Sequence, residues 1–472
     1  MKTQCNPSQL EFHALGRREV VGKFDGGNIT SDAGGLLLRE TEKRTGIIKG
    51  FAKCFKDLRD PALIEHTVKE LVSQRVYGLA LGYEDLNDHD ELRRDPLLAV
   101  LVGKEDPEGE TRARQKDKGK AMAGKSTLNR LELTPAEPTA KEQRYKKIIM
   151  KSEEIDRLFV DVFLQAHNEA PEEIILDVDA TDDPLHGKQE GRFFHGYYMN
   201  YCYLPLYIFC GEFLLCARLR PSNIDASEGT VEELERIIDQ IRIAWPEVRI
   251  IVRGDSGFCR EAVMSWCEAH KIDFVFGFAK NERLKAIIAE ELQQAHELYE
   301  ETMRASRVFK DFRYQTRESW SRERRVVAKA EYLDKGANPR FVVTSIGMQK
   351  MDASILYEQL YCGRGDMENR IKEQQLWLFA DRTSASKMRA NQLRLYFSSV
   401  AYMLMQALRR LGLRGTQMAK AQCNTIRLKL LKIGAQVKIS VRKVWVSLAS
   451  GCPYLELFYQ VYRNLQFAAI RC

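Results

Sequence analysis

Two aspartates each follow a run of apolar residues, a pattern that places a carboxylate at the end of a buried strand. Asp179 closes the run 174–179, and Asp255 follows the run 248–253. A carboxylate among apolar residues is costly unless it is paired or binds a cation. Carboxylate oxygens are hard ligands, which suit Mg²⁺ and, as a substitute, Mn²⁺. The two aspartates are therefore candidate metal ligands.

A third acid, Glu368, lies far along the chain in a predicted helix, 367–379. An aspartate at a strand end is by itself more often a turn residue than a ligand, but Glu368 would complete a set of three carboxylates. Such a set can hold two divalent ions about 3.5 to 4 Å apart, which activate a water or a 3′-hydroxyl for in-line displacement at a phosphodiester. The acidic trio of Asp179, Asp255 and Glu368 therefore predicts catalysis on nucleic acid without a nucleophilic side chain.

Asp177 is the alternative to Asp179 on the first strand, because side chains two residues apart lie on the same face of a strand. We favour Asp179, which stands at the carboxyl end of the strand and in the sequence Asp-Ala-Thr. His186 and His195 follow soon after. A lone histidine is more often structural than catalytic, so no role is assigned to either.

The order of the apolar elements predicts how the two aspartates meet. Three strands are followed by a helix, a strand, a helix and a strand, which is the order of an RNase H-like α/β core. In such a core the first and fourth strands are neighbours. The expected elements are strands 174–179, 197–210 and 213–219, helix 228–244, strand 248–253, helix 261–270 and strand 273–278.

The rest of the chain is expected to surround this core, because 472 residues exceed the size of one ordinary domain. A β-rich insertion separates the fifth strand from the helix that carries Glu368. We expect a mainly helical N-terminal domain at 1–102, a polar connector at 103–145, the two parts of the core at 146–283 and 351–412, the insertion at 284–350, and a basic C-terminal segment at 413–472.

Basic residues gather towards the C-terminal end of the chain. From Arg382 onward there are sixteen lysines and arginines against one acid, Glu456, whereas the whole chain has a net charge of only +7. Segregated positive charge is typical of a surface that binds a polyanion, because neutralised phosphates release counterions. A solvated helical face normally mixes both signs. We expect this end to bind DNA, and removal of 413–472 to weaken binding and flatten its salt dependence.

Several other classes of protein are not expected. No stretch approaches the eighteen apolar residues of a membrane span, and the eleven cysteines contain no C-x-x-C pair. We therefore expect no membrane contact and no zinc module, in a bacterial cytoplasmic setting near the nucleoid. Residues 119–126 match the P-loop expression letter for letter. The polar residues 112–118 before them cannot form the buried strand that a phosphate loop needs, so no nucleotide is expected.

Three stretches carry a resemblance to a known family. They are 176–183 (LDVDATDD), 252–258 (VRGDSGF) and 361–373 (YCGRGDMENRIKE). Together they resemble the DDE transposases of bacterial insertion sequences, and the chain is most similar to insertion-sequence family 1380. The resemblance extends over nearly the whole chain, including 88–96 and 126–132. It implies that the acidic trio is the catalytic set, and that the helical N-terminal domain at 1–102 binds DNA and helps to recognise the terminal repeats.

Related transposases carry the signature Tyr-x2-Arg-x3-Glu-x6-Lys, in which the residues around the glutamate grip the phosphates of the transposon end. Tyr361, Arg364 and Glu368 match it, whereas the lysine position holds Gln375. Lys372, one helical turn after Glu368, could take the place of that lysine. Tyr361, Arg364 and Lys372 are therefore expected DNA contacts.

Arg253 and Trp320 complete the expected DNA contacts. Arg253 lies two residues before Asp255 in the second stretch of resemblance. Some relatives trap a flipped base on an aromatic residue of their insertion, and an unpaired base gains about 1 to 3 kcal/mol on an aromatic ring. Trp320 lies between two predicted strands of the insertion, with arginines around it. The alternative is that Trp320 packs inside its own hairpin.

The resemblance also implies a function and its partners. A DDE transposase cleaves double-stranded DNA at terminal inverted repeats, exposes a 3′-hydroxyl and joins it to target DNA, here by a cut-and-paste route. Two DNA ends need two active sites, so a homodimer is expected in the DNA complex. Two alternatives stay open: an RNase H-like nuclease that cuts without joining, and a non-catalytic DNA-binding protein derived from a transposase.

Overall fold

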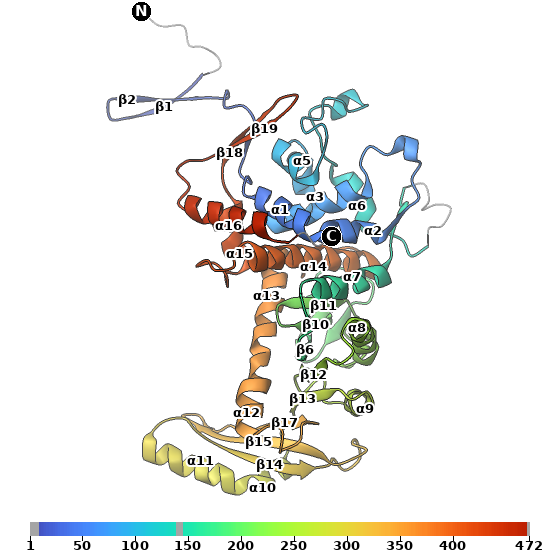
Figure 1. Cartoon of the computed structure of the whole chain (residues 1–472), viewed down its shortest axis with the longest axis vertical. Coiled ribbons are helices and arrows are strands. Elements are labelled where there is room, and N and C mark those ends of the chain that lie inside the picture. The colour runs from blue at the N-terminus through green and yellow to red at the C-terminus, as the bar shows by residue number, and fades with distance from the viewer. Residues whose placement is uncertain (1–8, 138–144, 470–472) are drawn as a thin grey trace, which may run out of the picture.

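The molecule is elongated, with a helical body at one end, a sheet in the middle and a β-rich part at the other end (Figure 1). The computed structural model describes residues 9–137 and 145–469. Residues 1–8, 138–144 and 470–472, which fall in the predicted segments 1–102, 103–145 and 413–472, lie outside the described residues. Among the described helices, none combines the length and the apolar content that crossing a bilayer requires.

One mixed sheet runs through the middle of the molecule. Its central strands β6 (Glu173–Ala180), β12 (Arg249–Gly254) and β13 (Asp273–Phe278) are parallel neighbours. Beyond β6, the strands β10 (Leu206–Cys210) and β11 (Phe213–Arg218) continue the sheet in antiparallel fashion. The central strands read as continuous apolar runs because both faces of the sheet are covered. The mixed α/β fold predicted from the sequence is confirmed.

The alternation of side chains along β12 divides the core between the two faces of the sheet. Ile250 and Val252 belong to the apolar cluster that includes the buried face of α8 (Thr230–Ala244) and part of α9 (Glu261–Ala269). Ile251 belongs to a separate cluster on the opposite face. The apolar residues of α8 recur every three or four positions, which gives a helix one buried stripe. These helices thus hold β12 in place beside β6.

A nearly continuous helical rod crosses the opposite face of the sheet (Figure 1). It begins as α12 (Ala353–Ile355), widens into a π-helical turn at Leu356–Tyr361, tightens into a 3-10 turn at Cys362–Arg364 and continues as α13 (Gly365–Leu378). The π-helical turn packs against Ile251 of β12. Irregular turns of this kind are frequent at functional sites, and here they contain the Tyr and Arg of the expected signature.

The strands of the predicted insertion extend the same sheet. β17 (Arg340–Thr344) pairs antiparallel with β13, and β15 (Arg324–Leu333) and β14 (Ser306–Tyr314) follow beyond it. The helix α11 (Ala289–Thr302) packs on these outer strands. The insertion is therefore joined to the core by backbone hydrogen bonds from β13 onward, and the rod starts directly after β17.

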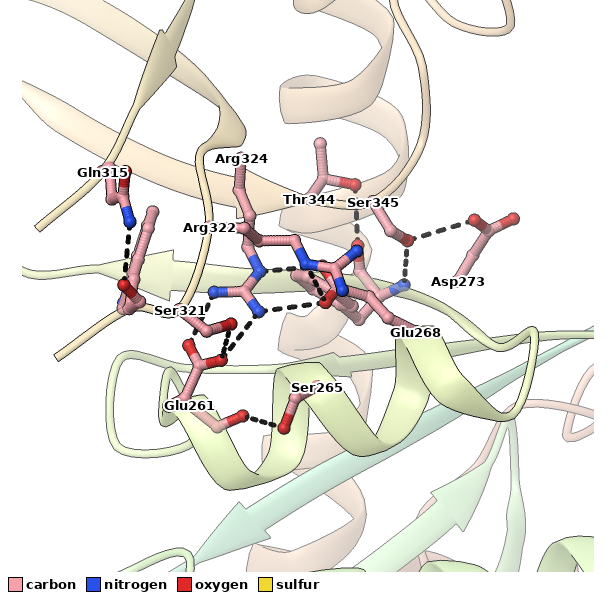
Figure 2. A network of polar contacts seen from close by, with 12 residues as sticks. Glu261, Ser265, Glu268, Asp273, Gln315, Ser321, Arg322, Arg324, Thr344 and Ser345 are labelled. Carbon is pink, nitrogen blue, oxygen red and sulfur yellow. Dashed lines mark hydrogen bonds and ion pairs between the residues drawn. The ribbon is translucent and has the colours of Figure 1, made fainter.

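A buried arginine fastens the insertion to the core from the side (Figure 2). Arg324 of β15 is 2% exposed and donates from Nη1 to Glu261 at 2.7 Å and from Nε to Glu268 at 2.8 Å. Both glutamates belong to α9. Arg322 lies 3.5 Å from Glu268 but is largely exposed. Arg324 is thus the main ionic link between α9 and the extended part of the sheet.

The helical body is built around the long helix α14 (Met388–Leu411). It packs against α1 (Gly35–Thr45), α2 (Ile47–Lys53) and α3 (Val68–Leu81), which come from the N-terminal part of the chain. Buried residues of all four helices form one apolar cluster. The helices α3 and α14 therefore share a core, although more than 300 positions separate them in the sequence.

The C-terminal part of the chain completes the same body. The strand β18 (Ala435–Ile439) pairs with β3 (Ile29–Thr30), and α16 (Leu455–Phe467) packs on α1. A Cβ added at Gly34 would lie 1.8 Å from the carbonyl oxygen of Leu430, so the two chain segments touch backbone to backbone. The described part of the basic segment, residues 413–469, is therefore an integral part of the helical body.

Two details depart from the elements expected from the sequence. The chain of the first segment opens with a hairpin of β1 (Gln9–Leu15) and β2 (Arg18–Lys23), which precedes the helices. The predicted strand 197–210 is interrupted at Pro205, which has no N–H to give to a ladder. Its first half is β9 (Asn200–Tyr203), which belongs to a small separate sheet.

Candidate active site

The register of the sheet brings Asp179 and Asp255 side by side. β6 and β12 are parallel, and Val178 lies opposite Gly254. Asp255 follows Gly254 directly, one residue past the paired strand, and neighbouring strands lie about 4.8 Å apart, so it lies at the same end of the sheet as Asp179. Burial raises the pKa of the Asp179 carboxyl, and the negative charge of Asp255 adds to this rise. Two acids that are 76 positions apart in sequence thus share one edge of the sheet.

Asp177, two residues before Asp179 on the same strand, is neutralised by an arginine. Arg253 donates from Nε to Oδ1 at 2.5 Å and from Nη2 to Oδ2 at 2.8 Å, and its Nη1 donates to the carbonyl of Leu360 in the rod. Both side chains are buried, 5% and 8% exposed. Arg253, which the sequence suggested as a DNA contact, therefore links β6, β12 and the rod in this arrangement, and its donors face other parts of the chain.

Arg364 lies between the first and third predicted acids. Its Nη2 donates to Glu368 at 2.7 Å, and its Nη1 is 3.5 Å from Oδ2 of Asp179. The same guanidinium group thus contacts both carboxylates, so Glu368 and Asp179 are separated only by the guanidinium of Arg364. Burial raises the pKa of Asp179 to about 7, the charge of Arg364 opposes this rise, and the charges of Asp255 and Glu368 add to it. The guanidinium of Arg364 therefore contacts two of the three acids and also interacts electrostatically with the third, Asp255.

Tyr361 lies on the same side of the sheet as the acids. A Cβ added at Gly277 of β13 would lie 2.6 Å from the hydroxyl of Tyr361 and 3.0 Å from the backbone nitrogen of Ser256. Only a glycine at this position leaves room for the phenol to approach the turn that follows Asp255. An isolated glycine inside a strand is the sequence signal for such a close approach, although it does not name the partner.

Two further side chains border the site. Tyr198, which sequence reasoning did not single out, donates to the carbonyl of Ala180 at 3.2 Å, and the nearby carboxylates of Asp182 and Asp179 add to the rise of its pKa that burial causes. Gln375, at the lysine position of the signature, donates to the carbonyl of Asp182 at 3.1 Å. Tyr198 comes from an irregular loop, so no periodicity or spacing marks it in the sequence.

Lys372 and Trp320 lie in contrasting surroundings. Lys372 of α13 is exposed, one turn after Glu368. Trp320 is 5% exposed and packs against Phe278 with ring centres 4.9 Å apart. The indole also lies against Arg324. Trp320 therefore packs inside the fold, as the alternative interpretation proposed, and in this arrangement its ring is covered and does not face a base.

The three carboxylates fit a divalent cation by their chemistry. They supply hard oxygen donors at the ends of neighbouring elements. The pKa of Asp179 is raised by burial and by the negative charges of Asp255 and Glu368, so a nearby cation would stabilise its charged form. In the described part of the chain, no three acidic, histidine or cysteine side chains surround a common point closely enough to hold an ion as they stand. Arg364 supplies positive charge to Asp179 and Glu368 there.

The comparison with known proteins identifies the family. Among curated proteins, none is significantly similar to the chain. The family model described as transposase DDE domain group 1, in contrast, matches residues 12–470, which is nearly the whole length. The match includes the strands that carry the two aspartates, the rod that carries Glu368 and both parts of the helical body. The chain belongs to the family of DDE-domain transposases of group 1.

Proposed function

We propose that the protein is a DNA transposase that cleaves double-stranded DNA at terminal inverted repeats and joins the exposed 3′-hydroxyl to target DNA by a cut-and-paste route. The observation that supports the proposal is that Arg364 contacts both Asp179 and Glu368, and that β12, which leads into Asp255, pairs with the strand of Asp179, in a chain that belongs to this family. The strand order β11-β10-β6-β12-β13, with β6 and β12 adjacent, supports an RNase H-like catalytic core.

DDE transposases generally use divalent metal ions, and the acidic trio is the set that would hold them here. Two Mg²⁺ ions, or Mn²⁺ as a substitute, would supply activation of the attacking oxygen and stabilisation of the leaving oxygen. Asp179 and Asp255 offer adjacent carboxylates from two fixed strands. Glu368 offers the third from the start of α13, when Arg364 no longer lies between it and Asp179.

Arg364 and Tyr361 are suited to the DNA side of the reaction. A guanidinium matches the geometry of a phosphate, to which it can donate two parallel hydrogen bonds. Arg364 is about one-fifth exposed, so a phosphate can reach it from solvent. Movement of Arg364 from the carboxylates to a DNA phosphate would place the scissile bond beside the acids and at the same time free Glu368. Tyr361 ends the π-helical turn and Arg364 ends the 3-10 turn. These turns change the helical spacing, so both side chains can lie on the face of the rod that contacts the sheet.

The partners follow from the reaction. The substrate is double-stranded DNA that carries terminal inverted repeats, and the second substrate is target DNA. Two ends have to be cut and joined, so we propose that two copies of the chain act together in the DNA complex. The setting proposed for this reaction is the bacterial cytoplasm, at the nucleoid.

The acids are tested by isosteric substitution in the full chain. Asp179→Asn and Asp255→Asn should each reduce Mg²⁺-dependent strand cleavage by at least about 100-fold, because the charge that holds the ions is removed. Binding to end DNA should persist. Asp366→Asn is the matched control, since it removes an exposed carboxylate two residues before Glu368 on the same helix and should leave cleavage unchanged.

The products decide between the proposed function and its alternatives. With plasmid that carries the ends of the element, a transposase yields strand-transfer products, whereas a nuclease yields breaks alone. Cleavage or transposition that persists in the Asp179 and Asp255 variants would overturn the assignment of the acids. Binding to the ends without any cleavage by the wild-type chain would favour a non-catalytic DNA-binding protein.

A further inference from the structure

A second hairpin leaves the helical body as a two-stranded ribbon. It consists of β18 (Ala435–Ile439) and β19 (Val444–Leu448), joined by the four residues 440–443 (Figure 1). The turn is closed at the tip, because the N–H of Ser440 donates to the carbonyl of Lys443 at 2.9 Å and the N–H of Lys443 donates to Oγ of Ser440 at 3.2 Å. The hairpin is anchored at its base where β18 pairs with β3.

The two faces of this hairpin differ in character. Val437 is 2% exposed and belongs with Ala435 to the core of the helical body, against which Ile439 and Val446 pack. On the other face, Lys438 and Trp445 are directly opposite each other and both are exposed. Trp445 has 57% of its surface exposed, which is unusual for the largest apolar side chain. The packing of the inner face against the helical body stabilises the hairpin. The exposed side chains of Lys438 and Trp445 on the outer face do not contribute to that packing.

The outer face and the tip carry positive charge without compensation. Lys438, Arg442 and Lys443 are all exposed, and none of the three forms an ion pair with a carboxylate in the described part of the chain. Lys443 lies over the ring of Trp445, with its Nζ 5.2 Å from the ring centre. Val441 at the tip is fully exposed. Residues 427–448 contain no acid at all, so this surface combines cations with exposed apolar groups.

We propose that the hairpin 435–448 is a DNA-contacting wing, which enters a groove of duplex DNA. Lys438, Arg442 and Lys443 bind backbone phosphates, and Trp445 makes the apolar contact inside the groove. The major groove of B-DNA, about 12 Å wide, admits a two-stranded β-ribbon. The inference rests on the proposed function and deepens it, since it names one surface of the basic C-terminal segment as the contact.

The charge of the hairpin favours DNA over a second copy of the chain. In a two-fold symmetric contact, the same patch meets itself, so cations would face cations across the axis. The hairpin of β1 and β2 shows the contrast, because it is also exposed but carries Glu11 and Glu19 beside its basic residues. A surface with cations and without acids is complementary to a polyanion.

The wing is tested in the full chain with a fluorescently labelled duplex of mixed sequence, whose binding is measured over a series of KCl concentrations. The triple variant Lys438→Gln, Arg442→Gln, Lys443→Gln should flatten the plot of log Kd against log salt by about 0.9 for each phosphate that is no longer neutralised. The matched control is Lys271→Gln, Lys335→Gln, Lys350→Gln. It removes the same charge from three exposed loops of the sheet region and should keep the wild-type slope.

The tryptophan is tested separately from the charges. Trp445→Ala should weaken binding about 5-fold or more, because the apolar contact with the base edges in the groove is lost, and should leave the salt slope unchanged. Trp445→Phe should restore most of the affinity. All variants should unfold at the wild-type temperature, since the substituted side chains are exposed.

The outcomes separate the wing from the proposed function. If the wild-type chain does not bind duplex DNA, the proposed function is overturned together with the wing. If the wild-type chain binds but the triple variant keeps its slope and affinity, or the control is weakened as much, the wing alone is overturned. Weaker self-association of the triple variant without DNA, measured by sedimentation, would assign the hairpin to a second copy and would also overturn the wing.

Discussion

At the scale of the residue, Arg364 determines the charge state around the acids. It is the nearest cation to Asp179 and is hydrogen-bonded to Glu368, so it offsets repulsion among the three carboxylates. Asp177 and Asp179, which lie on the same face of β6, therefore have different arginine partners. Asp177 is paired with Arg253 in a closed, buried contact, whereas Asp179 meets a partly exposed guanidinium at a longer distance. A partner that is more distant and more exposed is easier to displace.

The role of Arg364 can be tested by Arg364→Gln. We expect weaker DNA binding by about 10-fold and a salt slope lower by about 0.9, because one phosphate is no longer neutralised. The pKa of Asp179 should rise further, since Arg364 opposes its rise in the wild-type chain. Binding is measured by fluorescence anisotropy at several salt concentrations. A variant with the wild-type slope would show that Arg364 does not contact phosphate.

A buried histidine makes the helical body sensitive to acid. His89 is fully buried, and burial lowers its pKa to about 3. Its Nδ1 lies 3.0 Å from Nε2 of Gln74, which fits a neutral ring. The folded pKa is below the unfolded value near 6.5, so the stabilisation is fully present above about pH 6.5 and is lost as the pH falls towards 3.

Urea unfolding at pH 7 and pH 5 checks this dependence. Between these two values the wild-type chain should lose about 1 to 2 kcal/mol more unfolding free energy than His89→Gln, at a maximum of about 1.4 kcal/mol per pH unit. The comparison of the two chains cancels the other titrating groups. Equal losses in both chains would contradict a neutral buried His89.

At the scale of the element, the insertion is held by the pairing of β17 with β13 and by the ion pairs of Arg324. Arg324→Met should lower the unfolding free energy by about 3 to 5 kcal/mol, because it leaves Glu261 without its ion pair and Glu268 with only the exposed Arg322 as a partner. Arg322→Met is the control. Its side chain is 64% exposed, so its removal should change the unfolding free energy by no more than about 0.5 kcal/mol.

Thermal and chemical unfolding measure the unfolding free energies of Arg324→Met and Arg322→Met, which are then compared with that of the wild-type chain. The activity of Arg324→Met, if the variant is folded, should fall only through a smaller folded fraction, since the hydrogen bonds of Arg324 go to α9 and to none of the three acids. A variant as stable as Arg322→Met would show that the β17–β13 ladder alone holds the insertion.

The elements of the sheet could be predicted because their signals are local. The run 174–179 becomes β6, and the apolar stripe of 228–244 becomes α8, with ends that move by one or two residues. The order of strands also indicated that Asp179 and Asp255 would be adjacent. The place of Arg364 could not be predicted, because it depends on how the rod is rotated over the sheet. The burial of Trp320 likewise depends on Phe278, which is distant in sequence.

At the scale of the whole molecule, the two ends of the chain form one body. Local patterns cannot reveal this, because no periodicity in residues 1–102 specifies which later helix will cover them. The basic residues of 413–472 indicated a DNA-binding tail, and the segment also supplies core residues. The basic surface and the apolar core occupy opposite sides of the same elements, as Val437 and Lys438 show in β18.

Truncation therefore has a different effect from the one that charge alone predicts. A chain that ends at residue 412 lacks Leu430, Leu431, Val461 and Leu465, all of which are fully buried. Removal of even one such side chain costs about 2 to 5 kcal/mol, which is a large fraction of the about 5 to 15 kcal/mol that stabilise a whole domain. We expect the truncated chain to lose cooperative unfolding of the helical body, as measured by calorimetry. A truncated chain with the wild-type transition would contradict an integral role of this segment.

The joining of distant chain segments also sets a time order during synthesis. Arg44 donates to the carbonyl of Ala468, a partner that follows 424 positions later. At about 5 to 20 residues per second, the ribosome needs roughly 20 to 80 s to deliver that partner. The early helices emerge long before the residues that cover them, so they are candidates for chaperone binding during this interval. A polypeptide released prematurely by a frameshift or a nonsense codon would lack a finished body and would be open to proteolysis.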